Sequence, residues 1–320
     1  MADNNQKIFK KKNYYTSRGV VILFFALVIL ADFFTGKVLN YFYFRQTSGW
    51  DFETKYSIED TKADVLIFGA SRAQQQYNPE FIEDSLNLTC YNVGRDGMPF
   101  FYHYAVLQGV LKRYSPKIIL LDCEYGVLKK TKSSYERISC LLPYYKAHPE
   151  MRSVIELRSP FEKYKLLSQI YPYNSLMFKI ASGNLSSGKK KNETIKGYMP
   201  LTRSLDEPIK TIDYTKEYEV DSLKVNMLQS FIDDCKKRNI KLFILCSPYY
   251  INPVGKDYSM KLVEEKAATN NINFLDYSKE KIFLSNSKLF DDTVHVNTTG
   301  SKIFSTMLAA DLKKKLQEQK

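Results

Sequence analysis

Short apolar runs alternate with longer amphipathic segments along most of the chain from Asp64 onward. A short apolar run bounded by turn residues is typical of a strand buried on both faces. The runs that predict such strands are Val65–Phe68, Cys90–Val93, Ile118–Asp122, Leu242–Cys246 and Ile272–Leu275. The segments that predict helices start at Asn78-Pro79 and at Ser301, or cover Phe100–Tyr114, Ser222–Arg238 and Tyr258–Ala268. Strands that alternate with helices predict an α/β fold with a parallel sheet covered on both faces.

The N-terminus has a different pattern, because Val20–Ala31 is an unbroken apolar stretch preceded by Lys10–Lys12. This stretch is shorter than the ~20 residues that cross a bilayer. Residues 19–36 can still span the membrane if Asp32 lies near the far headgroups and the aromatic residues after it lie at the interface. A cleaved signal peptide and a buried helix are the alternatives, although Ile29-Leu30-Ala31 makes a poor cleavage site.

These patterns divide the chain into successive regions. We expect a cytoplasmic basic tail at 1–18, a transmembrane signal-anchor at 19–36, a juxtamembrane connector at 37–60 and the sheet domain at 61–316. The basic residues ahead of the span predict a single-pass protein of the cell membrane, with its main domain outside the cytoplasm. The strand and helix alternation breaks down over about 125–220, which we interpret as an insertion or lid over the carboxyl edge of the sheet.

Composition narrows the class of function. The 320 residues carry 47 Lys and Arg against 35 Asp and Glu, for a net charge of +12, but no long basic stripe indicates a nucleic-acid surface. The 5 cysteines and 3 histidines show no metal-ligand spacing. We therefore expect no nucleic-acid partner, no metal and no cofactor.

Three segments with chemically useful residues come directly after predicted strands or just before the last helix. Ser71 follows the first strand, where its hydroxyl is exposed and nearby amides can face an anion. The segment Asn92-Val93-Gly94-Arg95-Asp96-Gly97 follows the second strand. In the third segment Asp292 precedes His295 by three residues, so its carboxylate can orient the imidazole ring as it does in hydrolase triads. Ligands bind at the carboxyl ends of parallel strands, where these segments should meet.

In their order and placement, the three segments resemble the SGNH, or GDSL-like, hydrolase family, and its divergent membrane-anchored branch in particular. The resemblance covers about residues 61–316 and implies a three-layer α/β/α sandwich with a mostly parallel, flavodoxin-like sheet of five strands. It also implies that Ser71 attacks an ester carbonyl, His295 takes its proton and Asp292 orients His295.

The same resemblance places the amides of Ser71 and Gly97 in an oxyanion hole. Two departures from the family pattern are visible. Gly69-Ala70-Ser71 stands where Gly-Asp-Ser is usual, and no asparagine follows the strand Ile118–Asp122, where the family has an oxyanion donor. The substitutes we consider are Arg72, Asn92 and Arg95, and with Gly94 these are our candidates for substrate binding.

Two classes of function remain open. The first is an exported serine esterase or O-acyltransferase that acts on acyl, most simply acetyl, esters of a cell-envelope glycan, and related proteins of this branch imply a membrane acyltransferase as partner. Hydrolysis and transfer share the acyl-enzyme step, so the sequence does not separate them. The second is a catalytically degenerate module that binds glycan or scaffolds an envelope polysaccharide assembly.

Overall fold

The computed structural model describes residues 2–185 and 194–318. The chain forms two compact units, which we describe separately. Unit 1 comprises Met1–Gln46 and Phe161–Ser187, and unit 2 comprises Thr47–Pro160 and Gly188–Lys320. The side chains of residues 1–17 in the expected basic tail, and residues 186–193 of the expected insertion, lie outside the described residues.

Unit 2 contains a sheet of five parallel strands in the order β2-β1-β3-β5-β7. The strands are β1 (Val65–Phe68), β2 (Cys90–Asn92), β3 (Ile118–Asp122), β5 (Lys241–Cys246) and β7 (Asn273–Asp276). This is the flavodoxin-like strand order, in which the direction of winding reverses between β1 and β3. In register, Val65 lies opposite both Cys90 and Ile118. The predicted fold class and the five predicted strands are confirmed.

Helices cover both faces of this sheet because successive strand side chains point to opposite sides. On one face Val65 and Leu120 pack with Ile82 and Phe304, which belong to α4 and α13. On the other face the Phe68 ring lies 5.5 Å from the ring of Phe231 in α10. Both faces are therefore apolar, which explains why the strands appear in the sequence as continuous apolar runs.

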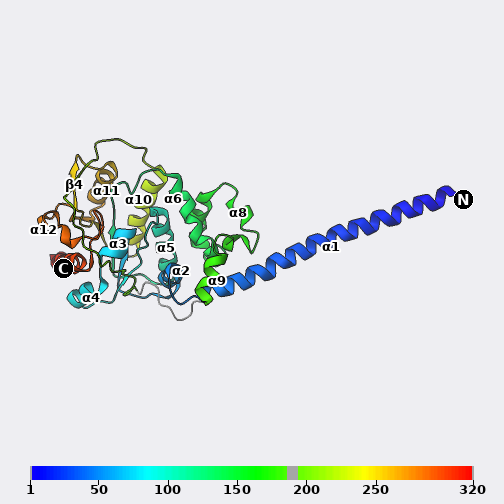
Figure 1. Ribbon diagram of the computed structural model, residues 1–320, viewed down its shortest axis with the longest axis horizontal. Helices are drawn as coiled ribbons and strands as arrows, with labels where there is room; N and C mark the ends of the chain where they lie inside the picture. Colours follow the sequence, from blue (N-terminus) through cyan, green and yellow to red (C-terminus); the bar gives the residue numbers. More distant parts are fainter. Residues whose placement is uncertain (1, 186–193, 319–320) are drawn as a thin grey trace. The chain divides into compact units, whose positions relative to one another are not determined.

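The longer helices of unit 2 begin and end close to their predicted bounds. Figure 1 labels four of them, α4, α5, α10 and α11. They are α4 (Pro79–Leu86), α5 (Phe100–Arg113), α10 (Ser222–Lys237), α11 (Tyr258–Thr269) and α13 (Thr298–Glu318). The shorter ones are α2 (Trp50–Lys55), α3 (Ser71–Gln76), α6 (Lys132–Glu136), α7 (Arg152–Ile155) and α12 (Lys281–Leu284). A π-helix at Tyr56–Asp60 and the 3-10 helices Arg137–Tyr144, Pro149–Met151, Glu156–Arg158 and Ser287–Leu289 complete the helical set described in this unit.

Several elements of unit 2 have no counterpart in the sequence prediction. The polar helix α3 lacks an apolar period, yet five of its residues are buried. A separate pair of parallel strands, β4 (Lys210–Asp213) and β6 (Ile251–Val254), lies outside the main sheet.

The region expected to form one insertion is divided, because 125–160 belongs to unit 2 and 161–187 belongs to unit 1. Its role as a lid stays a prediction.

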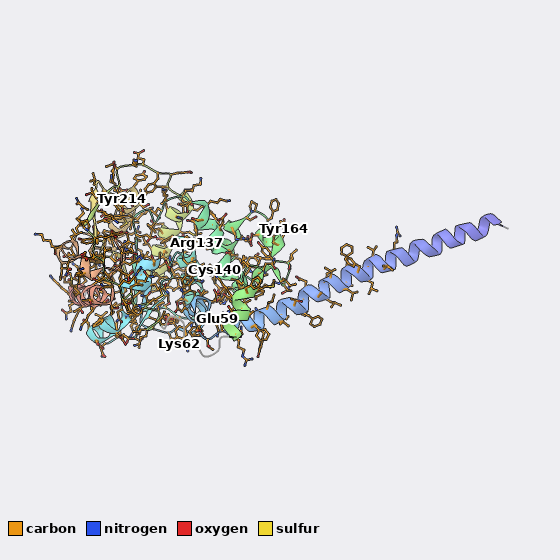
Figure 2. All side chains as sticks on the ribbon, in the orientation of Figure 1. Glu59, Lys62, Arg137, Cys140, Tyr164 and Tyr214 are labelled. Carbon is orange, nitrogen blue, oxygen red and sulfur yellow. The ribbon has the colours of Figure 1, made fainter. Side chains whose placement is uncertain are left out.

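Unit 1 consists of the long helix α1 (Ala2–Phe44) and a helical segment that packs against it. That segment contains α8 (Glu162–Lys165), the 3-10 helix Tyr171–Tyr173 and α9 (Met177–Leu185). The part of α1 from residue 18 to 44 is long and apolar enough to cross a membrane. Its side chains project outward from the ribbon in Figure 2. The helix continues through the first part of the expected connector at 37–60 and ends at Phe44. Near this end the Tyr43 ring lies 5.9 Å from the Tyr173 ring. This exposure does not fit the buried-helix alternative.

Candidate active site

The turn after β1 presents Ser71 at the carboxyl edge of the sheet. Gly69 has a φ of +144°, and a methyl group there would lie 2.9 Å from the carbonyl oxygen of Asp122. The close approach of this turn to the end of β3 therefore requires glycine. Ser71 is the first residue of α3, so its hydroxyl lies just beyond the strand.

Ser71 and His295, 224 positions apart in sequence, come together at this edge. The Nε2 atom of His295 lies 2.8 Å from Oγ of Ser71. On the opposite side of the ring, Nδ1 of His295 lies 2.8 Å from Oδ2 of Asp292. The three side chains predicted from the sequence thus form one continuous serine–histidine–carboxylate chain, the arrangement that activates a serine hydroxyl.

The loop that carries His295 is held in place by backbone and side-chain contacts. Oδ1 of Asp292 accepts hydrogen bonds from the amides of Val294 and His295, at 2.8 and 2.9 Å. Burial acts to raise the pKa of Asp292, but the hydrogen bonds from His295 and the Val294 amide outweigh it and hold the pKa below its usual value. The carboxylate therefore stays ionised opposite the imidazole.

The neighbouring carboxylate, Asp291, faces away from the histidine. It is 8% exposed and binds the Arg203 guanidinium at 2.7 Å and the Arg203 amide at 2.9 Å. Asp291 therefore holds the loop in place, while Asp292 contacts the imidazole ring of His295.

Helix α3, which the sequence pattern did not predict, positions the two other loops. The Gln76 side chain donates to the carbonyl oxygen of Val294 at 2.7 Å. The Gln74 side chain accepts a hydrogen bond from the amide of Asp96 at 2.9 Å. The sequence signal for this role is a run of glutamines directly after a buried strand. Buried glutamine side chains need hydrogen-bond partners, and neighbouring loops can supply them.

The loop after β2 lies against the serine turn. The Arg95 amide donates to the carbonyl oxygen of Gly69 at 3.1 Å. A methyl group at Gly94 would lie 2.9 Å from Cβ of Ala73, so this glycine permits the close packing of the two loops. Gly97 has a φ of +67° and lines the same cavity as Ala70. That the Ser71 and Gly97 amides bind an oxyanion stays a prediction.

The four candidates for substrate binding, Arg72, Asn92, Gly94 and Arg95, are buried and contact other parts of the protein, and substrate binding by them stays a prediction. Arg72 is 1% exposed, stacks 3.5 Å from the Tyr249 ring centroid and donates to the Ser247 hydroxyl at 2.6 Å. Asn92 donates to the carbonyl oxygens of Ala73 and Tyr77.

The other two candidates are engaged in the same way. Arg95 pairs with Asp51 at 3.3 Å, and the Gly94 amide donates to Oδ1 of Asn92 at 2.9 Å. These contacts hold the strand ends and loops together.

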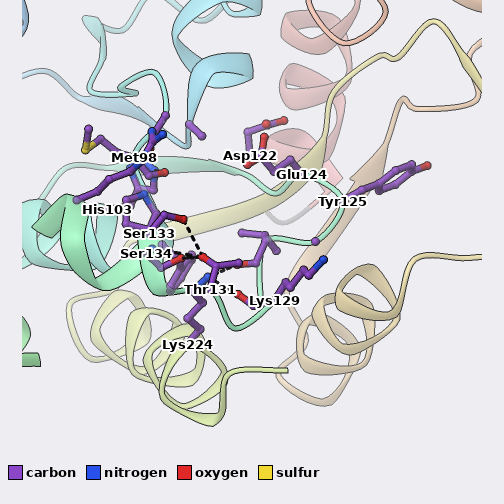
Figure 3. Close-up of a pocket in the computed structure, with 17 residues that line it drawn as sticks. Met98, His103, Asp122, Glu124, Tyr125, Lys129, Thr131, Ser133, Ser134 and Lys224 are labelled. Atoms are coloured by element: carbon purple, nitrogen blue, oxygen red, sulfur yellow. Dashed lines mark hydrogen bonds between the residues drawn. The ribbon is translucent and has the colours of Figure 1, made fainter. Parts of the chain in front are cut away.

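A cavity of about 300 Å³ is lined by Ala70, which precedes Ser71 in the turn, and by Gly97. Figure 3 shows Glu124 and Tyr125 on one wall and Thr131, Ser133 and Lys224 on another. Polar side chains with an adjacent apolar wall suit a small oxygen-rich group.

Two basic groups that line this cavity are shifted by burial. Burial lowers the pKa of His103 to about 4, which keeps its imidazole neutral at physiological pH. Burial also lowers the pKa of Lys224 to about 8, and its ammonium donates to the carbonyl oxygen of Lys129 at 2.7 Å. Lys224 therefore stays mostly protonated at physiological pH, whereas His103 carries no charge there.

Glu124 lines the cavity and has no role among the residues predicted from the sequence. It follows β3, at the place where the family resemblance leads one to expect an asparagine. Burial raises the pKa of Glu124, and the nearby Arg72 charge offsets only part of that effect. A protonated carboxyl can donate a hydrogen bond, as an asparagine amide does. Among the described residues, no group of three or more His, Cys, Asp and Glu side chains could hold a metal ion.

No protein-family model and no curated protein matches this sequence. Several solved structures resemble it at low identity. A protein described as an acylhydrolase of Bacteroides fragilis is 14% identical, with a TM-score of 0.42 over 84% of this chain and 100% of its own. The acetyl xylan esterase AlAXEase is 13% identical, with a TM-score of 0.38 over 78% and 98%. The acetyl xylan esterase Est2A of the rumen bacterium Butyrivibrio proteoclasticus is 9% identical, with a TM-score of 0.35 over 79% and 64%.

Proposed function

We propose that this protein is a serine acyl-ester hydrolase or O-acyltransferase whose nucleophile is Ser71. The observation that carries the proposal is the chain of contacts from the Ser71 hydroxyl through His295 to Asp292. A histidine within hydrogen-bond reach of a serine, itself oriented by a carboxylate, is the geometry that makes a serine nucleophilic.

The geometry supports a two-step mechanism. Oγ of Ser71 attacks the ester carbonyl while Nε2 of His295 takes the hydroxyl proton, and Asp292 stabilises the imidazolium that forms. The carbonyl oxygen becomes an oxyanion beside the serine turn. When the C–O bond of the ester breaks, His295 gives its proton to the leaving alcohol and an acyl-serine remains. Water or a second alcohol, deprotonated by His295, then attacks the acyl carbon. The bond from that carbon to Oγ of Ser71 breaks, His295 returns the proton to Oγ, and the acid or the new ester leaves.

We propose acetyl esters of a cell-envelope glycan as the substrate. A cavity of about 300 Å³ accommodates a small acyl group or part of a sugar better than a long acyl chain. The apolar helix at 18–44 supports attachment to a membrane. We propose that the sheet domain lies on the outer side, because basic residues precede the span, and that a membrane acyltransferase supplies or receives the acyl groups.

Turnover of an O-acetylated polysaccharide by the purified full chain tests this function. We expect acetate release, or acetyl transfer when an unacetylated oligosaccharide is added as acceptor, measured by mass spectrometry. The matched control is the same polysaccharide carrying only N-acetyl groups, which should remain intact because an amide is a poorer acyl donor. Binding of the glycan without release or transfer would support the alternative of a catalytically degenerate glycan-binding module.

We also propose that Glu124 takes the place of the missing oxyanion donor. As the pH rises through its raised pKa, Glu124 loses the proton it would donate and adds a negative charge beside the oxyanion. Activity should then fall. Glu124→Gln keeps a neutral donor, so we expect it to retain activity and to lose this fall with pH. Glu124→Ala should lower kcat by ~10²–10³.

Steady-state kinetics of both variants across the pH range are the measurement for Glu124. Equal losses in Glu124→Gln and Glu124→Ala would show instead that the ionised carboxylate is required.

A further inference from the structure

The segment 161–185 of unit 1 carries a group of exposed apolar side chains that the proposed chemistry does not use. Exposed fractions are 91% for Phe178, 75% for Leu167 and 66% for Phe161. Tyr164, labelled in Figure 2, and Met177 are exposed as well. The segment has its own interior, because Leu166, Tyr173 and Ile180 are buried. The exposed side chains therefore form an outer surface of a folded element, and such an apolar group indicates a contact with another apolar phase.

This segment is fastened to the apolar helix α1 at Asp32. The Asp32 carboxylate accepts hydrogen bonds from the Ser168 hydroxyl, from the Gln169 amide at 2.7 Å and from the Ile170 amide at 3.2 Å. A carboxylate in an apolar helix is costly unless its oxygens have partners. These donors supply them, and Asp32 in turn satisfies two backbone amides that could not be left unpaired in hydrocarbon.

The contact continues along one side of α1 at helical spacing. A methyl group at Gly36 would lie 2.5 Å from the carbonyl carbon of Gln169, so glycine is needed for the close approach. Asn40 donates to the Tyr173 hydroxyl at 2.7 Å, and the Tyr43 ring lies 5.9 Å from the Tyr173 ring. The remaining sides of α1, with Val28 and Val38 among their residues, are exposed.

The position of Asp32 along α1 fixes the depth of the segment. Asp32 lies about 20 Å along the helix axis from Arg18, and the hydrocarbon core of a bilayer is ~30 Å thick. With Arg18 at one headgroup layer, Asp32 lies inside the far half of the core. Lys163 lies 5.0 Å from the Tyr164 ring centroid, a combination of cation and aromatic ring typical of residues at a membrane interface.

We propose that residues 161–185 form a membrane-inserted element, clipped to α1 by Asp32, whose apolar side chains at Phe161, Leu167 and Phe178 contact the acyl chains of the same bilayer. This inference rests on the membrane attachment put forward under the proposed function. The sheet domain is then joined to the bilayer through two elements rather than through one helix.

Single-tryptophan variants of the full chain test this proposal, because Trp50 is the sole tryptophan in the sequence. In a Trp50→Phe background, Leu167→Trp and Phe178→Trp report on the segment, Val28→Trp reports on α1, and Tyr258→Trp is an exposed control in unit 2. Each variant is reconstituted in vesicles of equal parts phosphatidylcholine and phosphatidylglycerol, with or without acyl chains brominated near the middle of the chain.

We expect Leu167→Trp and Phe178→Trp to lose about half of their emission to the brominated lipid, as Val28→Trp does, while Tyr258→Trp is unaffected. Quenching of Val28→Trp alone would contradict the insertion of residues 161–185 and would still support membrane attachment through α1. Absence of quenching in Val28→Trp would overturn the anchor and the inference together. Shielding of Phe178→Trp from both brominated lipid and aqueous acrylamide would overturn the inference in favour of a second copy of the chain.

The clip is tested in the same vesicles. Asp32→Ala removes the acceptor of the Ser168, Gln169 and Ile170 hydrogen bonds, so we expect it to reduce the quenching of Phe178→Trp and leave that of Val28→Trp unchanged. Thr35→Ala, at an exposed polar residue of the same helix, is the matched control and should change neither. Equal quenching of Phe178→Trp with and without the Asp32 carboxylate would overturn its role as the clip.

Discussion

Replacing Ser71 with alanine is expected to lower kcat for ester cleavage by ~10⁴–10⁶, the loss typical of removing the nucleophile from a working triad. His295→Ala should have a similar effect, because the hydroxyl 2.8 Å from Nε2 of His295 then has no base. The double variant should be no slower than either single variant, since the two side chains act as one unit. Kinetics of the three variants on one acetyl ester are the measurement.

Folding should survive these substitutions, because Ser71 and His295 are both partly exposed at the edge of the sheet. Unchanged thermal unfolding of Ser71→Ala would show that a loss of activity comes from chemistry. Additive losses in the double variant would mean that the two residues act independently, contrary to the triad.

The second large effect is a difference between substitutions at two adjacent carboxylates, Asp292 and Asp291. Asp292→Ala should lower kcat by ~10²–10⁴ because the imidazole of His295 loses the group that orients it and stabilises its charge. Asp291→Ala should leave kcat within about tenfold, because this side chain binds Arg203 rather than the histidine. Its cost should appear in stability, at about 1–2 kcal/mol, since it removes the acceptor for the Arg203 amide and guanidinium.

Parallel measurements of kcat and of the free energy of unfolding decide this comparison. The expected pattern is crossed: Asp292→Ala impairs catalysis more than folding, and Asp291→Ala does the reverse. A larger loss of kcat in Asp291→Ala than in Asp292→Ala would contradict this assignment and show that Asp291 orients His295.

The sheet could be predicted from the sequence because its strands are buried on both faces. Continuous apolar runs such as Val65–Phe68 and Ile118–Asp122 leave few alternatives, and both match observed strands. Ser71, His295 and Asp292 could be brought together from sequence because parallel strands end at a common edge. Their hydrogen-bond geometry follows that expectation.

What the sequence did not reveal depends on contacts between distant polar residues. Helix α3 has no apolar period because its glutamines are buried against loops at Val294 and Asp96 instead of against a core. Arg72 directly follows Ser71 in the sequence and is a candidate for the substitute oxyanion donor, but nothing in the sequence indicates that its guanidinium stacks on Tyr249. Asp32 looked like an interruption of an apolar stretch, and its partners lie more than 130 positions away.

Covalent labelling of the purified full chain with a fluorophosphonate tests the central claim most directly, because this probe reacts with activated serines and spares ordinary ones. The predicted result is a single adduct in the intact mass that peptide mapping assigns to Ser71, with no adduct in Ser71→Ala and a much slower reaction in His295→Ala. An unlabelled Ser71 in a preparation that turns over an acetyl ester, or an adduct that persists in Ser71→Ala, would contradict the account.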